Sequence, residues 1–307
     1  MSSRTIVAVG GSGTHAVIAF LRLAILSNME IGQVPNVIVV DADTAPGGSE
    51  GATSTASLVD KAASLHRQVV EGCREQSRPY FRPFVPYVGQ TDQSDRIPAD
   101  TAFGDYLIGQ EVASAKAEDK LILDALFTRP VPAGEQRSEQ ETLIAQGFYA
   151  RPSIGATVIY DLLNANRAKL KDVLSKELAT ASRTIAVVGS STGGTGSGAG
   201  PAITQWLIAE KRRTKSQAKV ALFMTLPWFV SAPSASASGK DASYGDAKTL
   251  RLNAAAGVRL YAESGTLPDA GVFLADFNGH QHVRNDDGNF GQPEYPHVFN
   301  LMLASQI

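Results

Sequence analysis

The most informative part of this 307-residue chain is the stretch Ser191-Thr192-Gly193-Gly194-Thr195-Gly196-Ser197-Gly198. It follows a short apolar run at residues 185–188 and precedes an apolar helical pattern that begins at Pro201, a residue type favoured in the first turn of a helix. Glycines let the backbone approach a ligand closely, and the free N–H groups at a helix start point toward an anion. We therefore predict that residues 192–198 form a phosphate-binding loop between a strand and a helix.

The composition is typical of a globular protein and argues against several function classes. The chain is 43% hydrophobic and 19% charged, and its net charge of −2 gives no electrostatic reason to expect nucleic-acid binding. No apolar run approaches the roughly 18–20 residues of a membrane span. Cys73 is the only cysteine, which excludes an internal disulfide and is typical of a reducing compartment. We recognise no signal peptide at the N-terminus and expect a cytoplasmic location.

Strand-like and helical runs alternate along the chain, and this alternation predicts an α/β fold with a doubly wound, mainly parallel sheet and helices on both faces. The predicted strands are residues 5–9, 37–40, 185–188, 220–226 and 272–276. The predicted helices are residues 15–27, 57–75, 116–127, 135–146, 154–181, 201–211, 249–263 and 295–307. Because no linker or internal repeat stands out, we expect a single nucleotide-binding domain over residues 1–307. We have no interpretation for the long region around residues 78–146.

A second glycine-rich segment, Gly10-Gly11-Ser12-Gly13, follows the first predicted strand. Together with Thr14-His15-Ala16 it contains the pattern G-x-G-x-x-A, and Asp41 ends the next strand, where dinucleotide-binding folds carry a ribose ligand. Taken alone, this pattern indicates an NAD(P)-binding Rossmann protein. A dinucleotide fold needs only one such loop, however, and two loops that close on one nucleotide explain both glycine-rich segments.

The residues Gly189-Ser190-Ser191-Thr192-Gly193 also fit the nucleophile elbow G-x-S-x-G of serine hydrolases. The chain order permits a triad with Asp269 or Asp276 followed by His280, His282 or His297. An elbow enters its helix almost at once, whereas several more glycines follow here, each of which costs a helix about 1 kcal/mol. A hydrolase that uses Ser191 therefore remains an alternative, while a Walker-type loop is excluded because neither segment ends in Gly-Lys-Ser/Thr.

The order GGTGSG at residues 193–198 resembles the signature loop of the tubulin/FtsZ family of GTP-binding filament proteins, although Thr192 stands where the family prefers Gly, Ala or Ser. The resemblance implies a GTPase-type α/β domain that binds GTP or GDP with Mg²⁺. It places Asp43, in the run Asp41-Ala42-Asp43, near the magnesium ion, and Arg151 in a loop that senses the γ-phosphate. A solvated turn or helix cap remains the alternative for Asp43, and a surface arginine remains the alternative for Arg151.

The same resemblance implies further ligands and a partner. Pro227, in Thr225-Leu226-Pro227-Trp228-Phe229, falls beside the ribose, and Asn278 and Asn300 fall where the family reads guanine, although an ordinary helix position remains the alternative for Asn300. Residues 294–307 correspond to the start of the family's central helix, and we expect no second tubulin-like domain. We therefore expect a nucleotide-dependent assembly protein or regulatory switch that self-associates or binds a second chain. Hydrolysis of GTP is expected to be weak or partner-dependent, without an assignable catalytic residue.

Overall fold

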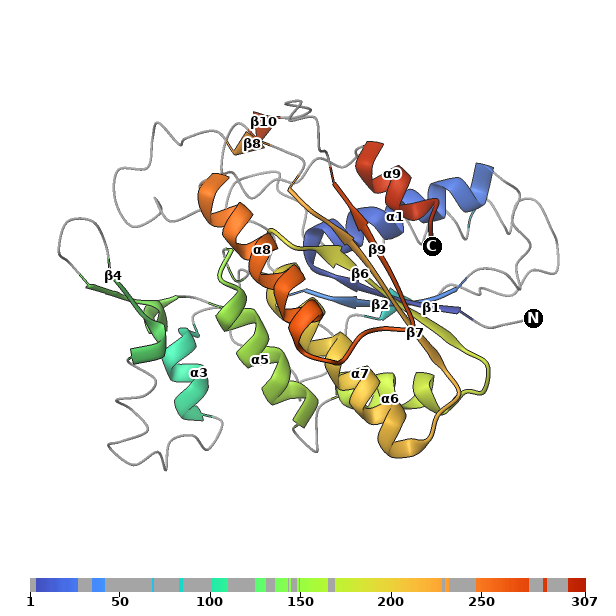
Figure 1. Ribbon diagram of the computed structural model, residues 1–307, viewed down its shortest axis with the longest axis horizontal. Helices are drawn as coiled ribbons and strands as arrows, with labels where there is room; N and C mark the ends of the chain where they lie inside the picture. The colour runs from blue at the N-terminus through green and yellow to red at the C-terminus, as the bar shows by residue number, and fades with distance from the viewer. Residues whose placement is uncertain are drawn as a thin grey trace.

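The computed structural model of the chain describes residues 4–26, 35–41, 68, 83–84, 101–109, 125–130, 136–142, 144, 148, 150–164, 169–227, 230–231, 247–275, 284–285 and 298–307. Within these residues the central feature is a six-stranded parallel sheet in the order β3-β2-β1-β6-β7-β9 (Figure 1). Its strands are β1 (Arg4–Val9), β2 (Asn36–Val40), β3 (Pro83–Phe84), β6 (Thr184–Ser190), β7 (Lys219–Thr225) and β9 (Ala270–Leu274).

Helices cover both faces of this sheet. One face carries α1 (Gly10–Leu26) and α9 (Val298–Ala304), which pack against each other. The other face carries α5 (Pro152–Asn164), α6 (Lys169–Ala179), α7 (Gly200–Thr214) and α8 (Ala247–Glu263). Helix α3 (Phe103–Gly109) lies to the side, beside α5, and Tyr106 donates to Asp161 of α5 at 2.7 Å (Figure 1). Smaller elements are the antiparallel pair β4 (Thr128–Pro130) and β5 (Gln136–Ser138), the 3-10 turn η4 (Glu139–Glu141), and the parallel pair β8 (Val230–Ser231) and β10 (Arg284–Asn285).

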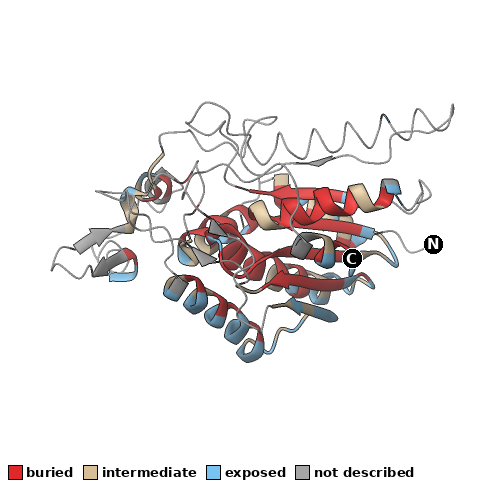
Figure 2. Cartoon of the chain, turned by 90° about the horizontal axis from the view of Figure 1, so that it is seen from above, coloured by how far each residue is buried: buried red, intermediate tan, exposed pale blue. Residues whose placement is uncertain are grey.

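The two helical layers are held by alternate residues of the same strands. In β1, Val7 and Val9 pack into the core beneath α5 and α7, whereas Ile6 and Ala8 pack into the core beneath α1 and α9. This alternation follows from the two-residue period of a strand. Because both faces are buried, the inner strands are nearly continuous apolar, β-branched runs. Figure 2 shows them as a buried centre, with exposed residues on the outer side of the helices of one layer.

The predicted fold class is confirmed, and five predicted strands correspond to β1, β2, β6, β7 and β9. Several helix predictions are wrong in their limits. The helix predicted at 154–181 consists of α5 and α6, and the segment 135–146 begins with β5 and η4 rather than a helix. The last helix spans Val298–Ala304 and ends before Ile307, while residues 295–297 lie outside the described residues. The helix predicted at 57–75 lies outside the described residues, except for residue 68.

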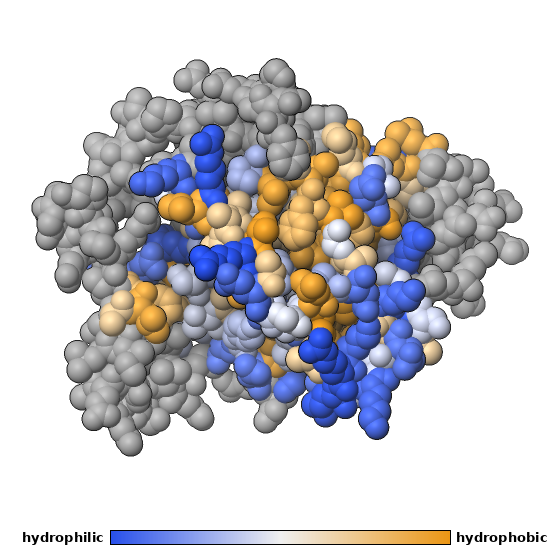
Figure 3. All heavy atoms as spheres, in the orientation of Figure 1, coloured by the Kyte–Doolittle hydropathy of each residue, from blue (hydrophilic) through white to orange (hydrophobic). Residues whose placement is uncertain are grey.

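One border of the sheet is less covered than its centre. Strand β9 has β7 as its neighbour on one side and is the last strand of the described sheet. Its residues are exposed or half-buried along the whole strand, and Phe273 is 40% exposed. Figure 3 shows hydrophobic residues gathered over this part of the molecule. Among the described residues, no helix is both long enough and apolar enough to cross a bilayer.

Candidate functional site

The strand order of the sheet reverses between the neighbouring strands β1 and β6. The chain runs outward from β1 to β2 and β3 and then returns to the other side of β1 with β6, β7 and β9. In an open parallel sheet, such a reversal of strand order is where ligands bind, at the carboxyl ends of the strands. The first helix, α1, begins at Gly10 directly after β1, and the helix that leads into α7 begins four residues after β6. Two helix starts therefore flank the reversal point.

The two glycine-rich segments touch each other at this point. Gly10 has a φ of +69°, a left-handed conformation that favours glycine. A Cβ atom at Gly10 would lie 3.1 Å from Cβ of Thr195 and 3.3 Å from the backbone nitrogen of Gly196. The backbone of the first segment thus comes directly against the second. The two glycine-rich segments are therefore adjacent in space.

The signature stretch is largely helical, which corrects the expected loop at residues 192–198. Residues 191–193 form bends, Gly194 already has helical dihedral angles (φ −58°, ψ −42°), and a π-helical turn, η6 (Thr195–Ala199), runs into α7. Such π turns occur frequently at functional sites. The cost of glycine in a helix predicts a loop here, but packing against neighbouring backbone overrides that preference.

The glycines of this stretch have two different roles. At Gly194, Gly196 and Gly198 a Cβ atom would lie under 3.0 Å from backbone oxygens of Phe148, Ser190 and Pro152, respectively. No side chain fits at these three positions, so they let η6 pack against β6 and the start of α5. At Gly193, by contrast, no atom of the described residues lies within 4 Å of a Cβ atom. Of the four glycines of the stretch, Gly193 is thus the one that faces open space.

Hydrogen bonds fix the turn between β6 and η6 to the end of β7. The backbone nitrogen of Ser191 donates to the carbonyl oxygen of Thr225 at 2.9 Å, and the Ser191 hydroxyl donates to the same oxygen at 3.1 Å. The hydroxyls of Ser190 and Thr192 are 2.6 Å apart, and the Thr192 nitrogen donates to Oγ of Ser190 at 3.2 Å. All three hydroxyl-bearing residues are buried. Hydrogen bonds within the protein therefore hold this turn in place without a ligand.

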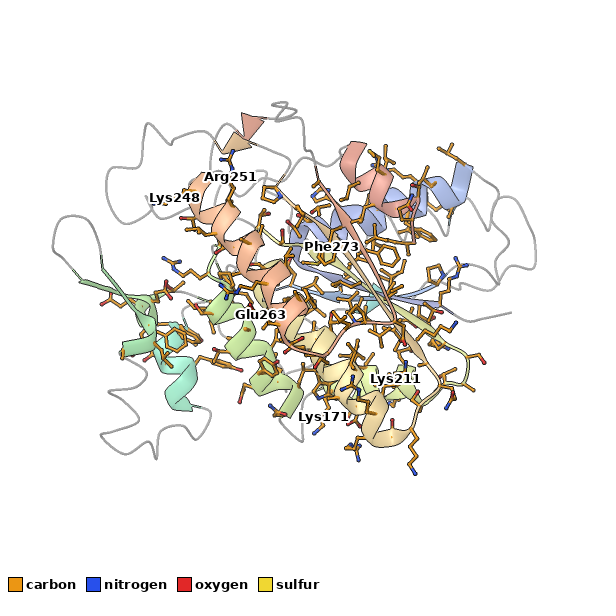
Figure 4. The ribbon with its side chains drawn as sticks, in the orientation of Figure 1. Lys171, Lys211, Lys248, Arg251, Glu263 and Phe273 are labelled. Atoms are coloured by element: carbon orange, nitrogen blue, oxygen red, sulfur yellow. The ribbon has the colours of Figure 1, made fainter. Side chains whose placement is uncertain are left out.

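The placement of Ser191 does not suit a nucleophile. Its side chain is buried, and its hydroxyl is committed to a backbone carbonyl. Asp269, one of the two predicted triad carboxylates, precedes the first residue of β9, whereas Ser191 follows the last residue of β6. The two residues thus lie at opposite ends of the parallel strands, and Asp269 pairs with Lys211 at 2.8 Å. Figure 4 shows Lys211 far from Lys248 and Arg251, which mark the other end of the molecule. Asp276 and the three predicted histidines lie outside the described residues.

Several other predicted site residues also lie at the carboxyl ends of the strands. Asp41 directly follows β2 and is buried, and Pro227 follows β7 by two residues. Gly11, Ser12 and Gly13 form the first turn of α1. A Cβ atom at Gly13 would lie under 3.0 Å from the Val188 carbonyl oxygen, so this glycine is required by packing.

Arg151 lies immediately before α5, and its Nε atom is 3.6 Å from a carboxylate oxygen of Glu139. The guanidinium is thus engaged with the η4 turn. Asp43 and Asn278 lie outside the described residues. The structure places the backbone of Asn300 in α9 and does not describe its side chain. Among the described residues, no group of three or more His, Cys, Asp or Glu side chains is arranged to hold a metal ion.

One residue that contacts the site was not found from the sequence. Asn253, on α8, donates from Nδ2 to the carbonyl oxygen of Ala150 at 2.9 Å and to that of Thr192 at 3.4 Å. It carries no motif, because an asparagine in an amphipathic helix has no distinguishing sequence pattern. Only the packing of α8 against η6 brings its amide to these two carbonyls.

Comparison with known proteins gave matches among solved structures. No model of a protein family matches the chain, and no curated protein sequence matches it. The matched structures include CetZ1 from Haloferax volcanii as a GDP-bound monomer, with 12% identity and a TM-score of 0.44 over 99% of this chain and 58% of that chain. They also include CetZ from Methanosaeta thermophila, with 15% identity and a TM-score of 0.42 over 99% of this chain and 52% of that chain.

A third match is CetZ2 from Haloferax volcanii in a GTPγS-bound protofilament, with 13% identity and a TM-score of 0.37 over 99% of this chain and 56% of that chain. The chain thus spans between 52% and 58% of the length of these three proteins.

Proposed function

We propose that this chain is a tubulin/FtsZ-like protein that binds GTP or GDP with Mg²⁺ in the crevice between β1 and β6. It acts as a nucleotide-dependent assembly protein or regulatory switch, with weak or partner-dependent GTP hydrolysis. One observation carries the proposal: two helix starts, at Gly10 and at Gly194, touch at the reversal point of a parallel sheet. The open position at Gly193 leaves room there for a phosphate group.

The physical basis is the electrostatics of helix starts. The first turn of a helix leaves backbone N–H groups without intrahelical partners, and the helix dipole adds roughly half a positive charge. No side chain caps the start of η6 with a hydrogen bond. Two such termini directed at one crevice favour a ligand with several negative charges, such as the phosphate chain of a nucleotide.

The remaining ligands follow from the sequence prediction. Asp41 and Pro227, at the ends of β2 and β7, are assigned to the ribose side of the nucleotide, and Asn278 and Asn300 to the guanine base. Asp43 is assigned to Mg²⁺, which prefers carboxylate and water ligands. When bound, Mg²⁺ would neutralise charge on the phosphate oxygens. Arg151 would reach the γ-phosphate only by leaving Glu139, its partner at 3.6 Å.

NAD(P) is the second candidate ligand, because one observation favours it. The strand order of this sheet is the order of dinucleotide-binding folds, and Asp41 lies at the end of β2, where those folds carry the ribose ligand. The direct contact between Gly10 and Thr195 is better explained by one nucleotide held by both segments. Under this alternative, the chain binds NAD more tightly than GDP.

The deciding experiment measures binding of GDP, GTP, ATP and NAD to the purified chain by calorimetry with Mg²⁺ present, after bound nucleotide has been removed and identified by chromatography. We expect guanine nucleotide in the purified protein and tighter binding of GDP and GTP than of ATP or NAD. Preference for NAD, or binding of none of the four, contradicts the proposal. Phosphate release across a range of protein concentrations then tests hydrolysis: an increase per subunit with concentration identifies a second copy as the activating partner.

A further inference from the structure

Asn253 joins two segments of the candidate site that are far apart in the chain. Its Nδ2 atom is 2.9 Å from the carbonyl oxygen of Ala150 and 3.4 Å from that of Thr192. Thr192 belongs to the turn before η6, and Ala150 precedes Arg151 and the start of α5. We infer that Asn253 is a positioning residue, which aligns these two turns for nucleotide binding. The inference rests on the proposed function, because it assigns a role within the same site.

The turn at Ala150 needs such support. Ala150 has a φ of +57°, a left-handed conformation that is unfavourable for a residue with a Cβ atom. Directly after it, the backbone nitrogen of Arg151 donates to the carbonyl oxygen of Phe148 at 2.8 Å, which closes the turn. The donation from Asn253 fixes the orientation of the Ala150 carbonyl and therefore of the peptide that links it to Arg151.

The two turns are also coupled through tight packing. A Cβ atom at Gly155 would lie under 3.0 Å from the carbonyl oxygen of Gly194, and one at Gly198 would lie equally close to that of Pro152. The start of α5 and η6 therefore cannot shift independently. The amide of Asn253 adds a link between them from a third element, α8. A ligand that contacts the turn at Thr192 would thus also bear on the turn before Arg151.

The chemistry of the side chain matters here, not only its size. Both acceptors are backbone carbonyls, and the amide of asparagine carries two N–H groups, one for each acceptor. Aspartate has nearly the same shape but, when ionised, no donor. Leu252, the preceding residue, is 59% exposed and offers a control on the same helix. Asn253 lies in the half of α8 where Figure 4 shows Lys248 and Arg251.

The test compares the wild-type chain with Asn253→Ala, Asn253→Asp and Leu252→Ala. Dissociation constants for GDP and GTPγS are measured by calorimetry, and the thermal midpoint is measured without nucleotide. We expect both Asn253 variants to weaken binding by about threefold to tenfold, the usual effect of a lost hydrogen bond, with Leu252→Ala unchanged. Wild-type affinity in Asn253→Asp overturns the inference. If the wild-type chain itself binds neither nucleotide, the proposed function fails instead.

A rescue variant separates positioning from a general structural role. Glycine adopts a positive φ at no steric cost, so Ala150→Gly restores the left-handed turn without the amide. In the double variant Asn253→Ala/Ala150→Gly we expect nucleotide affinity to recover at least twofold relative to Asn253→Ala. If Asn253 only anchored α8, the substitution Ala150→Gly would not restore nucleotide affinity. A double variant no tighter than Asn253→Ala therefore rejects the positioning role.

Discussion

Ser197 donates two hydrogen bonds to the carbonyl oxygen of Gly193, one from its backbone nitrogen at 2.8 Å and one from its hydroxyl. These bonds hold the Gly193 carbonyl toward η6. Gly193 is exposed, and no atom of the described part of the chain lies within 4 Å of a Cβ atom placed there, so this side of the turn is available to a ligand. The position can therefore be blocked without disturbing the helix that follows it.

Gly193→Val should abolish nucleotide binding while leaving the fold intact, because the new side chain would occupy the space assigned to phosphate. Gly257→Ala is the matched control, since a Cβ at Gly257 on α8 also meets nothing within 4 Å. We expect at least a tenfold loss of GDP affinity in calorimetry for Gly193→Val and none for Gly257→Ala. Equal affinities in the two variants would place the ligand elsewhere.

Gly196→Val should act on stability rather than directly on the ligand. A side chain there would collide with the backbone of Ser190 in β6, and overpacking of this kind typically costs about 1–3 kcal/mol or more. Urea denaturation of the nucleotide-free protein should show this loss, with Gly193→Val within about 0.5 kcal/mol of wild type. A Gly196→Val protein as stable as wild type would contradict the packing role.

Selection of guanine over adenine should depend on Asn300. An amide supplies both a donor and an acceptor to the base edge, and a buried group left without its partner typically costs about 1–3 kcal/mol. Competition between GTP and ATP should favour GTP in the wild type, and Asn300→Ala should reduce that preference. If the wild type binds GTP and ATP equally, the amides of Asn278 and Asn300 do not select the base.

The ion pair between Asp269 and Lys211 predicts a small, pH-dependent contribution to stability. Partial burial acts to raise the pKa of Asp269, but hydrogen bonds from Lys211 and the Val220 backbone outweigh it and hold the pKa below its ordinary value of 3.8. The contribution is therefore complete above the ordinary pKa and disappears as pH falls through the lowered one. The side chain is 42% exposed, so we expect less than about 1 kcal/mol.

Asp269→Asn tests this directly. Urea denaturation at neutral pH should show the mutant slightly less stable than wild type, and the difference should shrink toward zero as pH falls to about 3. High salt at neutral pH should reduce the difference as well, because exposed pairs are screened. A difference that grows on acidification would contradict the assigned direction of the pKa shift.

The strands were predictable, and the roles of individual glycines were not. Buried parallel strands are apolar on both faces, so β1, β2 and β6 are recognisable as short β-branched runs. The roles of Gly193 and Gly196 differ only through what lies opposite each of them. The segment 135–146 was wrongly predicted as a helix, because β5 depends on pairing with β4, which no local pattern reveals.

The exposed strand β9, the last of the described sheet, has a practical consequence for any assembly assay. A strand with unpaired backbone groups and exposed apolar side chains is a template for unintended association between chains. Strand β9 ends the described sheet, and Phe273 is partly exposed there. We therefore expect light scattering that does not depend on added nucleotide and that increases with time and temperature. Phe273→Lys should suppress this background. Scattering that survives in Phe273→Lys and still requires GTP would then report ordered polymerisation rather than precipitation.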